Sequence, residues 1–291
     1  MPATLACIAD EEIYRQWSAG LLQGQALGRR ATPYGDSGDV FRVQCDEAAF
    51  YLLARGGSGM DRTAPHRVNS CANLYALKDL GAHCILGWGP GAAVTHNIAE
   101  GDLVILSDVI DQTHQRTQTF FEDSPLGGLR QFPVFCDELR RRLAGILEDM
   151  KLIHHTSGVA AVREGPRLET PAEVRMLSMI GAEIVTHSFA PEPFLARELQ
   201  MGYAAVCYVT NYAETGSRYQ PYAAGGLFKD LGFITDAGRA GPAGALGRIA
   251  ANLAVSLANL DAVAYSPASS QSGHIEKFNL PADWREWFEH R

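Results

Sequence analysis

The sequence predicts a single-domain α/β protein in which helices cover both faces of a mixed β-sheet. Apolar runs typical of strands alternate along the chain with segments of helical periodicity, and this alternation favours such an architecture. With 291 residues the chain is long enough to bury a large core. No internal repeat or low-complexity linker divides it, so we expect residues 1–291 to form one domain.

The first half of the chain combines short apolar runs with one clear helix. Apolar residues recur at helical spacing over residues 68–77, and Gly81 stands where a helix C-cap belongs. Strands are predicted over residues 5–8, 41–43, 50–54, 84–86 and 103–106.

The second half begins with a helix over residues 139–150 and continues the alternation. Thr170 and Glu173 have capping-box spacing, and Pro171 occupies the first position of a helix that Gly181 closes. Further helices are predicted over residues 194–200 and 244–260, and strands over residues 159–162, 184–185 and 204–209. Segment 216–241 is either a lid or an ordinary surface connection. Near the carboxyl end, Trp284 and Trp287 are expected to pack against other structure, such as a neighbouring subunit.

Composition excludes several functional classes. A formal net charge of −8 argues against a nucleic-acid partner, and the basic run 140–142 fits a solvated helix face. No apolar run reaches the ~18 residues of a membrane span, and no signal peptide is evident. The six cysteines form no Cys-x-x-Cys pair and the histidines lack metal-ligand spacing. We therefore expect free thiols, a cytoplasmic location and no metal ion.

Two segments carry more polar chemistry than their local structure needs. Glu164, Arg167 and Glu169 crowd the turn before the capped helix, although capping requires none of them. The apolar run 204–209 ends in Thr210-Asn211-Tyr212. Strands that deliver polar residues at their carboxyl ends are typical of an active-site crevice in α/β proteins.

These segments belong to a longer match, which resembles the trimeric purine nucleoside phosphorylases and the 5'-methylthioadenosine phosphorylases. The further matching pieces, in chain order, are Thr32-Pro-Tyr-Gly35 with Leu52-Leu-Ala-Arg55, Val68-Asn69 through Asn73-Leu-Tyr-Ala-Leu77, Gly101-Asp-Leu-Val104 with Asp108-Val-Ile-Asp111, Gly181-Ala-Glu-Ile-Val185, Pro191-Glu192 and Ala196-Arg-Glu198. The resemblance implies a partly barrel-like central sheet and phosphorolysis of a purine nucleoside. It also implies orthophosphate as co-substrate, no other cofactor, and a homotrimer or hexamer.

The resemblance assigns four residues to phosphate. Arg55 follows a strand and precedes the glycine-rich turn 56–59, which suits an oxyanion because a guanidinium and backbone N–H groups lie together. A tight strand-to-helix turn is the alternative explanation of such a run. By position the phosphate-binding residues are Arg55, Gly56, Gly89 and Ser188.

The resemblance also assigns the base and nucleoside contacts. Asn211 and Glu169 are the catalytic candidates, because an amide can donate to purine N7 and O6 and a carboxylate can accept from the N1–H of a 6-oxopurine. The alternatives are a turn-forming Asn211 and a helix-dipole role for Glu169. The implied nucleoside-binding residues are Leu168, His187, Trp88, Pro90 and Tyr212. By resemblance, Asn211 with Glu169 favours a 6-oxopurine base. The Arg-Leu-Glu-Thr turn, with the later motif Pro-Glu-x-x-Leu-Ala-Arg-Glu, is similar to methylthioinosine-type phosphorylases and favours a 5'-methylthio nucleoside.

The chain departs from the family where the first strand ends. Ala9-Asp-Glu-Glu12 replaces a glycine-rich phosphate loop, and carboxylates there would repel an anion. We expect Glu11 and Glu12 to point away from bound phosphate or to reach the ribose. This departure leaves open a purine-binding or structural paralogue without turnover and a hydrolase that uses water. Methylthioadenosine as substrate also stays open, with Asn211 tolerating the 6-amino group.

Overall fold

The computed structural model describes residues 5–45, 48–59, 62–122, 128–213, 242–259 and 284–289. Its strands are β1 (Leu5–Ala9), β2 (Gly24–Gly28), β3 (Ala31–Thr32), β4 (Gly35–Asp36), β5 (Val40–Cys45), β6 (Ala48–Ala54), β7 (Cys84–Ala93), β8 (Leu103–Ile105), β9 (Asp108–Gln112), β10 (His154–His155), β11 (Val159–Arg163), β12 (Ile184–Thr186) and β13 (Gly202–Tyr212). Its α-helices are α1 (Glu11–Gln16), α2 (Ser70–Asp79), α3 (Asp137–Asp149), α4 (Pro171–Met179), α5 (Glu192–Glu198), α7 (Pro242–Asn259) and α8 (Glu286–Glu289). The segment 216–241 lies outside the described residues.

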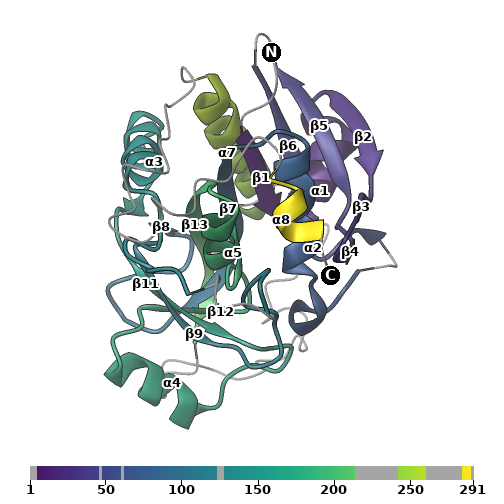
Figure 1. The fold of residues 1–291 in the computed structure, drawn as a ribbon. Coiled ribbons are helices and arrows are strands. Elements are labelled where there is room, and N and C mark those ends of the chain that lie inside the picture. The colour runs from purple at the N-terminus through teal and green to yellow at the C-terminus, as the bar shows by residue number, and fades with distance from the viewer. Residues whose placement is uncertain are drawn as a thin grey trace.

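Eleven strands form one mixed sheet that branches at β7 (Figure 1). The main path runs β10-β8-β13-β7-β1-β6-β5-β2. The first half of β7 pairs with β1 in parallel, and its last two residues pair with β12 in antiparallel orientation. On its other side β7 pairs in parallel with β13 along its whole length. On its free side β12 pairs in parallel with β11, and β11 pairs in parallel with β9. These three strands form the second branch of the sheet.

Gly91 allows three strands to meet at the branch. A Cβ atom at this position would lie 2.6 Å from Cys207 Sγ in β13 and 2.6 Å from Ile184 Cγ2 in β12. Such contacts are shorter than side chains tolerate, so a residue with a side chain would push β12 or β13 away. The glycine is therefore required by packing at the point where the sheet divides.

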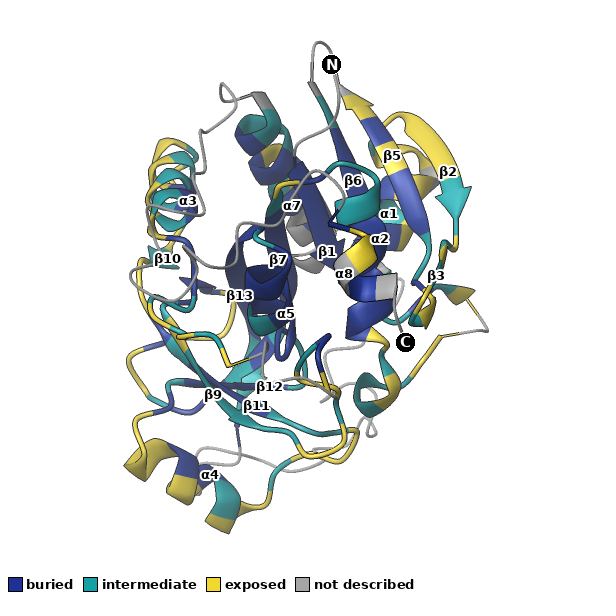
Figure 2. Cartoon of the chain, viewed as in Figure 1, coloured by how far each residue is buried: buried dark blue, intermediate teal, exposed yellow. Residues whose placement is uncertain are grey.

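Two layers of helices cover the two faces of the main sheet, and the strands between them are buried (Figure 2). Alternate residues of β1 and β6 belong to different cores, as the two-residue period of a strand requires. The first core lies between the sheet and helices α2, α5 and α8, which contribute Leu74, Leu195 and Phe288. The second core lies on the other face, where α1, α3 and α7 contribute Ile13, Leu143 and Leu253. A third, smaller core joins α4 to β11 and β12.

The predicted α/β class with a mixed sheet is confirmed, and each predicted helix or strand is present. Most bounds shift by a few residues, but the strand predicted over residues 84–86 extends to Ala93. The helix α1 and the π-turn Trp17–Leu21 that follows it were not predicted. Their signal was Asp10 before Glu-Glu-Ile, since the Asp10 carboxylate accepts a hydrogen bond from the Ile13 N–H as an N-cap.

Other expectations concern cysteines, membrane spans and the carboxyl end. Five described cysteines are free, and four of them are buried. None of the described helices has the length and hydropathy to cross a bilayer. Trp284 packs within the chain, with its ring 5.1 Å from that of Tyr75, whereas the side chain of Trp287 lies outside the described residues.

Candidate functional site

Three of the predicted phosphate-binding residues meet at one corner of the sheet. Arg55 follows β6, Gly89 lies in β7, and Ser188 comes two residues after β12. A Cβ atom on Gly89 would lie 3.2 Å from Ser188 Cβ and 3.3 Å from Arg55 Nη1. A side chain at this position would crowd Ser188, Arg55 and Phe189, so the glycine lets a guanidinium and a hydroxyl-bearing residue lie close to β7.

Arg55 is buried at this corner and is held by protein acceptors. Its Nε donates to Glu192 Oε1 at 2.5 Å and its Nη2 to Glu192 Oε2 at 3.3 Å. Nη1 donates to the Trp88 carbonyl at 3.0 Å, and Nη2 also donates to the Ile8 carbonyl at 3.3 Å. Of the five N–H groups, one on Nη1 has no acceptor among the described residues, and Nη1 is the atom of Arg55 that lies beside Gly89.

Glu192 neutralises Arg55, and Tyr203 binds the same carboxylate. The Tyr203 hydroxyl donates to Glu192 Oε2 at 2.5 Å. Burial opposes the charge of Arg55, but the adjacent Glu192 carboxylate outweighs it and raises the pKa of the guanidinium. Burial, followed by the charge of Glu192, raises the pKa of Tyr203 well above its usual value. The predicted site did not include Glu192 or Tyr203: Glu192 entered only as part of a matching motif, and Tyr203 stands in an apolar run without any signal.

The glycine-rich turn after Arg55 already binds carboxylates of the chain. The N–H and hydroxyl of Ser58 donate to Asp39 Oδ2 at 3.0 and 2.9 Å. The Gly59 N–H donates to Glu11 Oε1 at 3.0 Å, and Arg62 Nη1 donates to Glu11 Oε2 at 2.7 Å. The backbone groups of Ser58 and Gly59 that were expected to face an oxyanion are thus occupied. The assignment of Gly56 itself to phosphate stays a prediction.

Asp10 and Glu11, which follow β1, both bind groups of the protein. Asp10 caps α1 and accepts a hydrogen bond from the Tyr208 hydroxyl at 2.6 Å. Burial and the charge of Asp10 raise the pKa of Tyr208 well above its usual value. Glu11 reaches the glycine turn as described, and the side chain of Glu12 lies outside the described residues.

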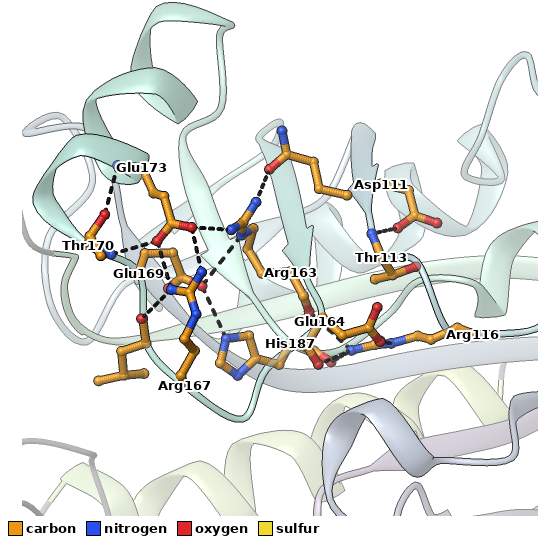
Figure 3. Close-up of polar contacts among 12 residues, drawn as sticks. Asp111, Thr113, Arg116, Arg163, Glu164, Arg167, Glu169, Thr170, Glu173 and His187 are labelled. Atoms are coloured by element: carbon orange, nitrogen blue, oxygen red, sulfur yellow. Dashed lines mark hydrogen bonds and ion pairs between the residues drawn. The ribbon is translucent and has the colours of Figure 1, made fainter.

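The polar turn before α4 is a network of charged groups (Figure 3). Glu169 Oε1 lies 3.3 Å from His187 Nε2 and 3.9 Å from Arg163 Nε, which brings two predicted site residues together. Glu173 completes the capping box and binds Arg163 and Arg167. Hydrogen bonds from Arg167 and from the Thr170 N–H lower the pKa of Glu173 to about 2.

Asn211 lies inside β13 and not in a turn after it. A bulge separates Val209 from Asn211, which pairs with Ala92 of β7. Asn211 Oδ1 accepts from Thr210 Oγ1 at 2.7 Å, and its Nδ2 donates to the Tyr212 carbonyl at 3.0 Å. These bonds fix the amide orientation and leave one Nδ2–H for another acceptor. Asn211 and Glu169 are each bonded to other partners, so their joint contact with a base stays a prediction.

The remaining predicted nucleoside contacts differ in exposure. Leu168 is 43% exposed and available to a ligand, whereas Pro90 is half-buried and accepts from Thr186 Oγ1 through its carbonyl. Trp88 is fully buried in the second core, on the face opposite Arg55, where its ring stacks on Tyr208 at 5.9 Å. Its Nε1–H has no acceptor among the described residues. This placement gives Trp88 a packing role and does not favour contact with a nucleoside.

Comparisons with known proteins agree on one family. The model of the phosphorylase superfamily matches residues 27–223. The chain is 36% identical over 189 residues to a 6-oxopurine nucleoside phosphorylase of Pyrococcus furiosus, covering 62% of this chain and 71% of that protein. It is 35% identical over 211 residues to a probable S-methyl-5'-thioinosine phosphorylase of Methanothermobacter thermautotrophicus, covering 72% of this chain and 71% of that protein.

The fold is also similar to that of a solved structure. A methylthioadenosine phosphorylase from Schistosoma mansoni, determined in complex with adenine, aligns with a TM-score of 0.78 at 21% identity. The alignment covers 93% of this chain and 99% of that chain. At this identity the similarity establishes the fold.

Proposed function

Because the chain belongs to the phosphorylase superfamily, we propose that it cleaves the N-glycosidic bond of a purine nucleoside by phosphorolysis. The products are the free base and a ribose 1-phosphate derivative. The observation that carries this proposal is the corner at which Arg55 Nη1 and Ser188 lie together beside Gly89. That corner offers a cation and a hydroxyl to an anion at the end of the sheet.

The reaction needs an anion held beneath the sugar and a stabilised leaving base. An oxygen of phosphate forms a bond to C1' of the ribose while the bond from C1' to the base nitrogen breaks, and the electron pair leaves with the base. Because the sugar has oxocarbenium-ion character at the transition state, positioning the phosphate and donating a hydrogen bond to the base lower the barrier most. Arg55 and Ser188 serve the first need, and Asn211 serves the second.

A 6-oxopurine base fits the remaining donor of Asn211. The amide orientation leaves an Nδ2–H free, which can bind O6 or N7. The relatives with this base include a nucleoside phosphorylase and methylthioinosine phosphorylases, and a 5'-methylthio substituent is the finer proposal. Methylthioadenosine is the alternative substrate, since related proteins carry that name.

A specific observation favours a second candidate function. The chain's own carboxylates bind the glycine turn, and Glu192 neutralises Arg55. Both features weaken the attraction for phosphate, as expected of a purine-binding paralogue without turnover.

We propose further that the protein assembles as a homotrimer or hexamer with sites completed by neighbouring subunits. A cytoplasmic location stays a prediction from the sequence.

A nucleoside panel tests the proposal directly. Release of free base would be measured from inosine, guanosine, adenosine, methylthioinosine and methylthioadenosine, each with and without orthophosphate. Phosphate-dependent release from a 6-oxopurine nucleoside is expected. Release that does not depend on phosphate would replace the proposal by a hydrolase, and binding of purines without release would replace it by the binding paralogue.

A further inference from the structure

The Arg116 guanidinium makes hydrogen-bond contacts with four backbone carbonyls, which belong to segments distant from it in sequence. Its Nη1 donates to the Ala190 carbonyl at 2.7 Å. Its Nη2 lies within hydrogen-bonding distance of three further carbonyls, those of Glu164 and His187 at 3.0 Å and of Arg163 at 3.1 Å. Figure 3 shows its side chain directed from the loop after β9 toward the ends of β11 and β12.

Glu164 fixes the same loop from the other side. Its Oε2 accepts the N–H groups of His114 at 2.5 Å and Gln115 at 3.0 Å, while its Oε1 lies 3.4 Å from Arg116 Nε. These amide bonds and Arg116 outweigh the effect of burial and lower the pKa of Glu164. The loop, the end of β11 and the residues after β12 are thereby tied to one guanidinium.

The hydrogen bonds of Arg116 lie next to residues of the candidate site. The carbonyls of His187 and Ala190 flank Ser188 on both sides, and Glu164 opens the turn that carries Glu169. Phe189, between the two carbonyls, has a φ of 76°, a conformation that bulky residues rarely adopt without support from their surroundings. The Arg116 side chain is only 5% exposed, so its bonds are shielded from water.

We propose that Arg116 is a positioning residue of the site, which holds Ser188 and His187 in fixed relation to the turn bearing Glu169. It does so through carbonyl contacts and does not itself touch the substrate. The functional part of this inference rests on the proposed phosphorolysis, whereas the geometric part does not.

Arg116→Lys tests the functional part. A lysine keeps the charge but has one donor atom, so it cannot span the four carbonyls that the planar guanidinium reaches. We expect kcat and kcat/KM for the preferred nucleoside to fall about tenfold or more, because small misplacements of reacting groups cost rate. Arg140→Lys is the matched control, since Arg140 combines one carbonyl contact, to Thr156, with an ion pair to Asp137 on α3. It should change kcat/KM less than about twofold.

Hydrogen exchange tests the geometric part, whether or not any nucleoside is turned over. Peptides covering residues 163–169 and 187–190 should exchange about tenfold faster in Arg116→Lys than in the unmodified protein or in Arg140→Lys. If the lysine variant does not fold, Glu164→Gln should give a smaller change in the same peptides. Unchanged exchange in these peptides would overturn the positioning role. Faster exchange with unchanged kcat, measured well below the unfolding temperature, would overturn its link to the reaction.

Discussion

Arg55 and Glu192 each depend on the other, because both charges are buried. Their side chains are 9% and 2% exposed, and the shortest distance between them is 2.5 Å. A buried ion pair is costly to break, since removing one partner leaves the other charge without solvent or counter-charge. A substitution of Arg55 that is intended to test phosphate binding therefore also leaves Glu192 without its partner and lowers stability.

We predict that Arg55→Ala and Glu192→Ala each lower the free energy of unfolding by about 3–5 kcal/mol. The double substitution should cost clearly less than the sum, because it leaves no lone charge. Urea unfolding of the four proteins measures the coupling. The exposed pair Arg62 and Glu11 is the control, for which coupling below about 1 kcal/mol is expected. Additive losses at Arg55 and Glu192 would contradict the structural account.

Asn211 leads to a prediction about base choice. Thr210 and Tyr212 hold its amide so that Nδ2–H is the available donor. The amide should therefore donate to the O6 of a 6-oxopurine. To accept from a 6-amino group it would have to rotate by about 180°, which would break both hydrogen bonds. We predict a higher kcat/KM for inosine-type than for adenosine-type nucleosides, by about tenfold up to the ~10⁴-fold that hydrogen-bonded sites reach.

Two variants test the reasoning about Asn211. Asn211→Asp should shift preference toward 6-aminopurines, because a carboxylate accepts from the amino group. Thr210→Val removes the hydroxyl that fixes the amide and should reduce discrimination without abolishing turnover. Equal or better turnover of the adenine nucleoside by the unmodified protein would favour methylthioadenosine as substrate.

At the scale of elements, the glycine turn and α1 form one unit. Glu11, at the first position of α1, binds the Gly59 N–H and Arg62, so the helix start covers the turn that follows Arg55. Its negative charge opposes the approach of a phosphate dianion to this end of the sheet.

Glu11→Gln should therefore lower the KM for phosphate, by roughly two- to fivefold for a screened charge worth up to about 1 kcal/mol. The KM for the nucleoside should stay the same. Glu138→Gln is a suitable control, because Glu138 is another carboxylate paired with arginines, on α3. An unchanged KM for phosphate in Glu11→Gln would show that the charge of Glu11 does not act on the anion, and a higher KM would contradict the proposed repulsion.

Elements were predictable where local signals were strong. The capping box at Thr170 and Glu173 and the apolar run of β1 were enough to predict their own elements. The apolar runs in β7 and β13 predicted that these strands exist, and β7 extends seven residues beyond its predicted end. The extent of β13 was not predictable, because the polar residues at its end pair with β7 only through a bulge. Helix α1 was missed although Asp10 is a regular N-cap, since its apolar stripe is too short to be read as periodic.

At the scale of the whole molecule, the site depends on contacts that no local pattern contains. Arg55 meets Glu192 across 137 positions, and Arg116 meets His187 across 71. Through the family resemblance the sequence could name Arg55, Gly89 and Ser188 as one set, and the structure brings them together. It could not reveal that Glu192 neutralises Arg55 or that Trp88 faces the opposite core, because both follow from how the sheet branches and twists.

The carboxyl-terminal helix α8 closes the first core by packing against segments from the start and middle of the chain. The ring of Phe288 lies 5.2 Å from that of Phe120 and 5.1 Å from that of Phe121, and its carbonyl accepts from the Tyr34 hydroxyl at 3.1 Å. Since Phe288 is only 2% exposed, Phe288→Ala should lower the free energy of unfolding by about 3–5 kcal/mol.

Urea unfolding measures this loss, and Glu286→Ala on the exposed part of the same helix is the control, with an expected change within about 0.5 kcal/mol. The two variants should differ by several kcal/mol although they lie two residues apart. The denaturant slope should be unchanged in both, because the surface exposed on unfolding is the same. Equal stability of the two variants would contradict the packing of Phe288 against Phe120 and Phe121.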